Sequence, residues 1–276
     1  MDSVVVLAAL LSAFLHAAWN AAVKASPDAQ GAMAAVVVGS GLAAVPALAF
    51  LPWPSAAALP WLAASALFNL LAMLTLVQGY AHGGFGFVYP LARAVSPLLV
   101  TLFANVLVGE SLSRTGIAGV ALISAGVAFF AVGRGRHGPA AFAYALAAGL
   151  FSAAYAVCDA QGARLSPSVL GYALVLSIVN AVVFGTTFRL RGGSIRDALA
   201  SNRAMAVFGA AAAILSYVLI LWVWERAPIA LGAALRDTSM VFGALIAVVV
   251  LRERMAPAQM GAVALVALGA GILRFA

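Results

Sequence analysis

Two arginines lie well inside apolar segments that are long enough to cross a lipid bilayer. Arg93 falls in YPLARAVSPLLVTLFANVLVGES and Arg236 in LGAALRDTSMVFGALIAVVVLRER. Each is followed at equal spacing by a serine, Ser96 or Ser239, so that the second pair lies 143 residues (236 − 93) after the first. A charged side chain at membrane depth is costly and usually faces a protein interior or a hydrated pathway. The duplication therefore predicts one central site to which two halves of the chain contribute.

The chemistry that suits these arginines is the recognition of an anion. A guanidinium group stays charged and offers a planar fork that matches carboxylate or phosphoryl oxygens. Residues three and four apart share a helix face, so the first stripe holds Tyr89, Arg93 and Ser96, and the second holds Arg236 and Ser239. We therefore predict that these five residues bind the anionic group of a small metabolite. The alternative is that each arginine is a structural clamp, bonded to helix carbonyls or to a nearby acid.

Asp237 follows Arg236 directly and is, by the expected span limits, the one carboxylate deep within a span. Three roles are open to it: binding a substrate amine, relaying a proton as a coupling group, or neutralising Arg93 across the interface between helices. On an ideal helix it faces away from Arg236, so its partner is expected on another segment.

The first apolar segment carries a second polar group of residues, His16, Trp19 and Asn20. A lone histidine on an apolar helix is often only a hydrogen-bonded packing residue. Histidine also titrates near neutral pH, which makes His16 a candidate for substrate binding and for proton coupling, with Trp19 and Asn20 as further substrate-binding candidates. A cavity with an aromatic wall is expected from Tyr80, Tyr89, Tyr155, Tyr217 and Trp222.

Glu110 and Glu253 end the two duplicated segments, and their position favours helix-end contacts over contacts in the pocket. Small residues seven apart, such as Gly119 and Gly126, favour close packing between helices. The chain has no second histidine or cysteine at metal-ligand spacing, so neither a metal nor a cofactor is expected.

The composition explains which solvent must surround these segments. Of the 276 residues, 65% are hydrophobic and 8% are charged, with a mean hydropathy of +1.10, whereas a soluble domain averages about 25% charged residues. The net charge of +7 is spread over short connections, which favours contact with anionic lipid head groups over binding of nucleic acid. Cys158 is the only cysteine, so no disulfide can form within the chain.

The apolar segments predict ten helices of roughly 20 residues each, the length that crosses a bilayer. A second sequence match, of Lys24 to Pro27 with Arg164 to Pro167, extends the repeat. We therefore predict an all-α membrane protein with ten transmembrane helices in two inverted five-helix repeats, 1–136 and 137–276, around a central cavity. The repeats must be inverted because five crossings reverse the direction of the chain. The expected limits are 4–25, 30–51, 60–81, 86–108, 114–133, 139–161, 168–190, 204–224, 229–251 and 256–275.

The doubled pattern, the ten spans and the Gly-Glu or Arg-Glu step that follows spans four and nine resemble the EamA family of the drug/metabolite transporter superfamily. The resemblance covers essentially the whole chain. It implies a secondary active transporter that exports or exchanges amino acids, amines or related metabolites by alternating access, often driven by protons. It also implies an integral multi-pass protein of the bacterial inner membrane, with a small-molecule substrate and the lipid bilayer as partners.

Two other classes of protein compete with this interpretation. A membrane-embedded enzyme should show a nucleophile with its base, or clustered histidines and carboxylates, and none of His16, His82 and His137 has such neighbours in the sequence. A passive channel or scaffold would need no inverted duplication with a pair of arginines at mid-membrane. We therefore expect a transporter and not an enzyme.

Overall fold

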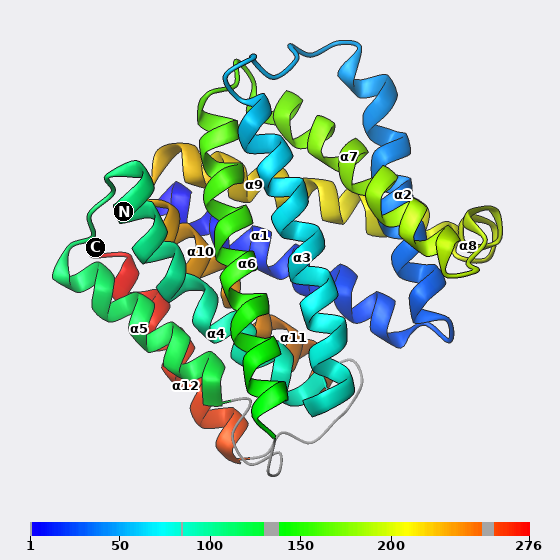
Figure 1. Ribbon diagram of the computed structural model, residues 1–276. Helices are drawn as coiled ribbons and strands as arrows, with labels where there is room; N and C mark the ends of the chain where they lie inside the picture. Colours follow the sequence, from blue (N-terminus) through cyan, green and yellow to red (C-terminus); the bar gives the residue numbers. More distant parts are fainter. Residues whose placement is uncertain (1, 84, 130–137, 250–256) are drawn as a thin grey trace.

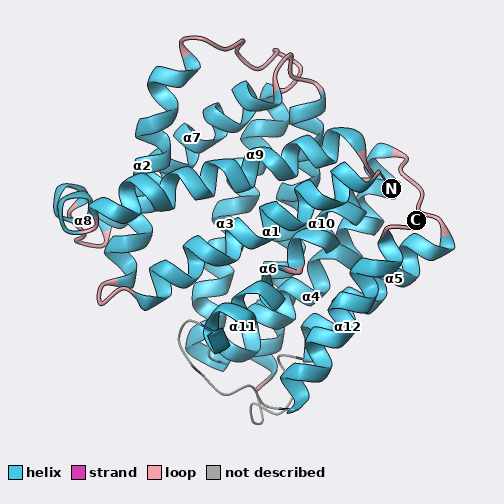
Figure 2. Ribbon diagram, turned by 180° about the vertical axis from the view of Figure 1, so that it is seen from behind, coloured by secondary structure: helices cyan, strands magenta, loops and turns pink. Residues whose placement is uncertain are grey.

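The computed structural model describes residues 2–83, 85–129, 138–249 and 257–276, and these residues form helices and connecting loops (Figures 1 and 2). No strand occurs within the described residues. The helices are α1 Ser3–Ala25, α2 Ala29–Leu48, α3 Leu59–Gly83, α4 Phe85–Phe103, η1 Ala104–Val108, α5 Arg114–Phe129, α6 Pro139–Arg164, α7 Val169–Leu190, α8 Ile195–Ser201, η2 Met205–Gly209, α9 Ala210–Arg226, α10 Ile229–Asp237, α11 Ser239–Val249 and α12 Pro257–Leu273.

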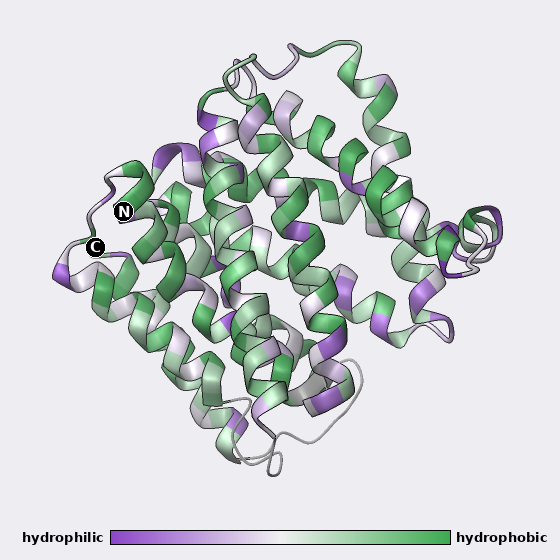
Figure 3. Ribbon diagram, in the orientation of Figure 1, coloured by the Kyte–Doolittle hydropathy of each residue, from purple (hydrophilic) through white to green (hydrophobic). Residues whose placement is uncertain are grey.

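In the described part of the chain, eight helical segments are long and apolar enough to cross a membrane, and the shorter helices α5 and α12 are apolar as well. Their outward side chains are hydrophobic: Leu7, Leu42 and Val182 are each more than half exposed. Figure 3 shows hydrophobic residues along the length of the helices, with hydrophilic ones concentrated near ends and connections. Because water would not tolerate such a surface, the solvent of these helices is lipid.

The helix starts follow from capping side chains in the loops. Asp28 accepts a hydrogen bond from the Gly31 amide at 2.9 Å, and Ser168 accepts one from the Gly171 amide at 3.0 Å. Such caps satisfy amides that have no partner inside the helix. At the other end of a helix, Gly109 stops η1 with φ of +75°, a backbone conformation that favours glycine.

Helices far apart in the sequence pack side by side. The main pairs are α3 with α6, α5 with α12, α2 with α7, α4 with α6 and α1 with α9. Small residues permit the α5–α12 approach, since a Cβ on Gly119 would lie 2.4 Å from Leu273 and one on Gly126 would lie 2.7 Å from Val266. The packing role predicted for these glycines is confirmed. The α1–α9 pair is joined by Ser12 and Ser216, whose hydroxyls each donate to the other's carbonyl, at 2.6 and 2.8 Å.

Two features of the helices differ from the sequence prediction. The span predicted over 229–251 is present over Ile229–Ile246, but Thr238 interrupts its helix between α10 and α11. The Thr238 hydroxyl donates to the Leu235 carbonyl at 2.6 Å, a local bond that competes with regular helix geometry. The short helix α8 lies in a stretch expected to be loop, and Ser194 caps it by accepting from the Asp197 amide. The expected boundary between halves, at residues 136 and 137, lies outside the described residues.

Candidate functional site

A cavity of about 390 Å³ lies among the helices, towards the end of the bundle where α1 ends and α2 begins. Its lining includes residues from the second half of α1, from the first half of α4 and α9, and from the middle of α2, α3, α6 and α7. Arg236 at the end of α10 completes it. The volume is in the range of small-molecule sites, about 300–1,000 Å³. Apolar side chains such as Met33, Met73 and Phe184 cover much of the wall. The polar lining residues are His16, Asn20, Ser40, Asn69, Tyr89, Arg93, Ser152, Tyr155, Ser177, Asn180, Tyr217 and Arg236.

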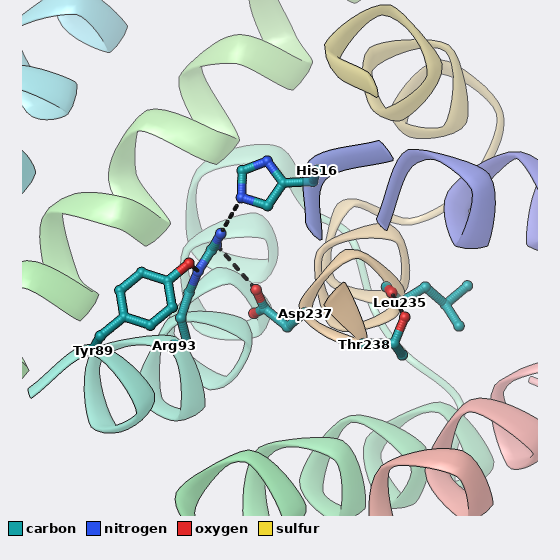
Figure 4. Close-up of polar contacts among 6 residues, drawn as sticks. All are labelled: His16, Tyr89, Arg93, Leu235, Asp237 and Thr238. Atoms are coloured by element: carbon teal, nitrogen blue, oxygen red, sulfur yellow. Dashed lines mark hydrogen bonds and ion pairs between the residues drawn. The ribbon is translucent and has the colours of Figure 1, made fainter. Parts of the chain in front are cut away.

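Arg93 is held at the cavity wall by three neighbours (Figure 4). Its Nη1 atom pairs with Oδ1 of Asp237 at 3.0 Å, and its Nε donates to the Tyr89 hydroxyl at 3.3 Å. Its Nη2 donates to Nε2 of His16 at 3.1 Å, since a guanidinium can only donate. The acceptor nitrogen of His16 therefore carries no proton in this arrangement. The Asp237 side chain is only 4% exposed, so this ion pair is largely shielded from water.

Arg236 also lines the cavity but has a different environment. It is 8% exposed, and among the described residues no carboxylate lies within ion-pair distance of it. Its buried Nε has no hydrogen-bond acceptor in this part of the chain. The guanidinium carbon lies 5.1 Å from the centre of the Tyr217 ring, a cation–π contact. Arg236 is thus a buried cation in the cavity wall with no ion-pair partner among the described residues.

Asp159 corrects the expectation that Asp237 is the one deeply placed carboxylate. Asp159 has no exposed surface, and the hydroxyls of Tyr217 and Tyr172 donate to its two oxygens, the second at 3.4 Å. Its position was underestimated because α6 continues to Arg164, whereas the predicted span ended at residue 161. The signal was present in the sequence as a single acidic residue within a long apolar run.

The structure brings together most of the predicted substrate-binding residues. Six of them line the cavity: Arg93, Arg236, Tyr89, His16, Trp19 and Asn20. Ser96 and Ser239 are buried at 6% and 5% exposure but are not among its lining residues, and Asp237 reaches the cavity only through Arg93. Of the aromatic wall, Tyr89, Tyr155 and Tyr217 line the cavity, whereas Tyr80 and Trp222 do not.

At the opposite end of the bundle, Glu110 connects the two halves of the chain through an ion pair and a hydrogen bond, which together we call the polar latch. Oε1 of Glu110 pairs with Arg164 Nη2 at 2.7 Å, and Oε2 accepts from the Ile229 amide at the start of α10 at 2.8 Å. Arg164 also donates to the carbonyls of Trp224 and Ala227, at 2.8 and 3.2 Å. The predicted helix-end contact of Glu110 is confirmed. Its sequence counterpart, Glu253, lies outside the described residues.

Glu110→Gln is expected to loosen this end of the bundle. Hydrogen bonds to charged groups contribute about 1.5–3 kcal/mol, so their loss should raise local opening about tenfold or more. Leu231, which is 3% exposed and lies in the first turn of α10, reports this opening as Leu231→Cys in a Cys158→Ser background. The rate of maleimide labelling measures it. Glu225→Gln breaks an exposed ion pair with Arg226 and is the matched control; equal labelling rates in both variants would contradict the latch.

A helical membrane protein with a cavity among its helices and two arginines in the cavity wall is the class that this fold and site define. Residues 140–275 match the model of the EamA-like transporter family. Through this match the chain belongs to that family, within the drug/metabolite transporter superfamily, as the sequence resemblance predicted. Members of the family are transporters rather than enzymes, and the chain is an integral multi-pass membrane protein.

The fold recurs in a solved structure described only as a crystal structure of a protein. The two share 20% sequence identity and a TM-score of 0.71, over 99% of this chain and 96% of the other. At this identity the likeness shows a common fold alone. A search of curated proteins gave no match.

Proposed function

We propose that this protein is a secondary active transporter of the bacterial inner membrane that exports or exchanges a small polar metabolite. The substrate carries a carboxylate or amine group, as an amino acid does, and is carried by alternating access around the cavity. The observation that supports this most strongly is Arg236, a buried cation in the cavity wall with no carboxylate within ion-pair distance among the described residues. A carboxylate on the substrate would supply an anionic acceptor for the guanidinium group of this residue, which lines the cavity.

The proposal gives the two arginines different roles. Arg236 contacts the anionic group, while Arg93 stays paired with Asp237 and orders the wall through Tyr89 and His16. Trp19 and Asn20 add an indole and an amide to the same wall. The apolar remainder of the cavity suits the body of a small amphipathic metabolite. His16 and Asp237, the two candidates for proton coupling that the sequence indicated, both contact Arg93 at this wall.

The proposed architecture is two inverted repeats of five helices. If α5 and α12 also cross the membrane, they and the eight candidate spans would make ten crossings. An even number of crossings fits the two chain ends, which lie on the same side of the molecule (Figures 1 and 2). In such a repeat, α1 corresponds to α6 and α3 to α9, so an α1–α9 contact should be matched by an α3–α6 contact. Both contacts are present, and α2–α7 and α5–α12 are the pairs expected to meet across the symmetry axis. This pattern supports the repeat and its alternating access.

Counterflow in proteoliposomes tests the transport function. Vesicles that contain the purified protein are loaded with an unlabelled mixture of amino acids and diluted into each labelled amino acid in turn. A transporter should give transient, saturable accumulation of at least one label above that of protein-free vesicles. Flux that does not saturate would indicate a channel, and chemical conversion of a label without its accumulation would indicate an enzyme; either result contradicts the proposal.

A further inference from the structure

The neighbours of Asp159 can form hydrogen bonds with its carboxyl group in both the ionised and the protonated state. Its partners are hydroxyl groups: Tyr217 from α9, Tyr172 from α7 and, facing the same carboxylate, Ser65 from α3. In the part of the chain that the structure describes, no lysine, arginine or histidine lies within ion-pair distance of it. A hydroxyl can donate to a carboxylate or turn and accept from a carboxylic acid, whereas a cationic side chain can only donate. The Asp237 carboxylate is paired with Arg93, which can only donate, so protonation of Asp237 would remove this ion pair.

Tyr217 is the partner that connects this carboxyl group to the cavity. Tyr172 and Ser65 are at most 1% exposed, but Tyr217 lines the cavity. Its hydroxyl donates to Oδ2 of Asp159, and its ring lies against the guanidinium of Arg236. A proton can therefore pass from the Tyr217 hydroxyl to Asp159 while the phenolic oxygen takes a proton from a hydronium ion in the cavity, which is left as water. The tyrosine ends as it began, and the net change is one proton added to Asp159.

We infer that Asp159 is a buried proton-binding site that exchanges its proton with the cavity through the Tyr217 hydroxyl. The charged and titratable groups that face it are the two tyrosines, Arg236 from α10 and, on its own helix, Cys158. Intramembrane carboxylates are a recurring element of proton relays. The geometry favours Asp159 over Asp237 for this role, because the Asp237 carboxylate already neutralises Arg93.

The proton on Asp159 controls how strongly Arg236 attracts an anion. With Asp159 ionised, one negative and one positive charge face the same tyrosine, and the pair is neutral as a whole. With Asp159 protonated, the charge of Arg236 is uncompensated and an anion binds more tightly. Linkage is reciprocal, so a bound anion must favour the proton equally. This coupling rests on the proposed transport function, and it makes the carrier loaded with one anion and one proton equal in charge to the empty one.

Infrared difference spectroscopy of the purified protein tests the proton site without any substrate. Acidification should produce a carbonyl band of a buried carboxylic acid that disappears in Asp159→Asn. The matched control, Asp197→Asn, removes an exposed carboxylate on α8 and should keep the band. Tyr217→Phe should move the band to another frequency, because the carboxyl group loses a hydrogen bond, and Arg236→Gln should move the pH of its titration. A band that survives in Asp159→Asn, or one that is the same in wild type, Tyr217→Phe and Arg236→Gln, would overturn the proposal.

The counterflow experiment separates this proposal from the transport function. Asp159→Asn vesicles should keep counterflow of the amino acid that the wild type carries but lose the dependence of its rate on pH. Unchanged pH dependence in that variant would overturn the coupling. Absence of counterflow in the wild type would count against the transport function alone, since the infrared titration decides the proton site independently.

Discussion

Arg236→Gln should abolish most substrate binding while leaving the fold intact. Removing one partner of a buried, hydrogen-bonded charge pair costs about 2–5 kcal/mol, so the affinity of an anionic substrate should fall about 30-fold or more. Stability should not fall in parallel, because Arg236 has no ion-pair partner among the described residues that the substitution would strand. Counterflow at graded concentrations of label measures the apparent affinity, and thermal unfolding in detergent measures stability.

The matched control for this prediction is Arg226→Gln. Arg226 is an exposed arginine near the end of α9, paired with Glu225 and stacked on Trp222 at 4.2 Å from the ring centre. The same chemical change there should leave counterflow at the wild-type level, since exposed ion pairs contribute about 0–1 kcal/mol. Normal affinity in Arg236→Gln, with intact folding, would remove Arg236 from the binding site.

The positions of the helices could be predicted because lipid as solvent leaves few options. Every backbone amide in the bilayer must bond within its own helix, so an apolar run of about 20 residues is a helix almost by necessity. The α6 helix was predicted over 139–161 and occupies Pro139–Arg164. What the hydropathy pattern could not contain was the break at Thr238, because it depends on one hydroxyl that bonds to the Leu235 carbonyl. A hydropathy value averaged over about 20 residues does not register one such side-chain hydrogen bond.

The sequence predicted most residues of the site, but it predicted fewer of the contacts between them. The sequence repeat located Arg93 and Arg236, and neutralisation of Arg93 by Asp237 across the helix interface was one of the roles open to that carboxylate. The repeat implied equal roles for the two arginines, but their surroundings differ. Asp237 pairs with one, and a tyrosine separates the other from Asp159. These differences depend on which helices pack against each other. A single sequence does not show those helix contacts.

Asp237→Asn is expected to destabilise the protein more than any other single change discussed above. It leaves the Arg93 guanidinium, whose side chain is 15% exposed, without its carboxylate partner. Breaking a buried ion pair from one side costs about 3–5 kcal/mol, because the remaining charge is desolvated and unpaired. His16 cannot replace the carboxylate, since it offers Arg93 only a neutral ring nitrogen. Denaturant unfolding in mixed micelles, followed by helical circular dichroism, measures the loss.

The double variant Arg93→Gln/Asp237→Asn shows whether this loss comes from the pair or from either residue alone. With both charges removed, no buried ion is stranded, so the double variant should be more stable than Asp237→Asn and close to the wild type. It should also keep substrate affinity within a few-fold, because Arg236 still faces the cavity. Additive destabilisation in the double variant would mean that the two side chains do not act as a pair. Loss of counterflow in a stable double variant would instead assign substrate contact to Arg93, the role that the proposed function reserves for Arg236.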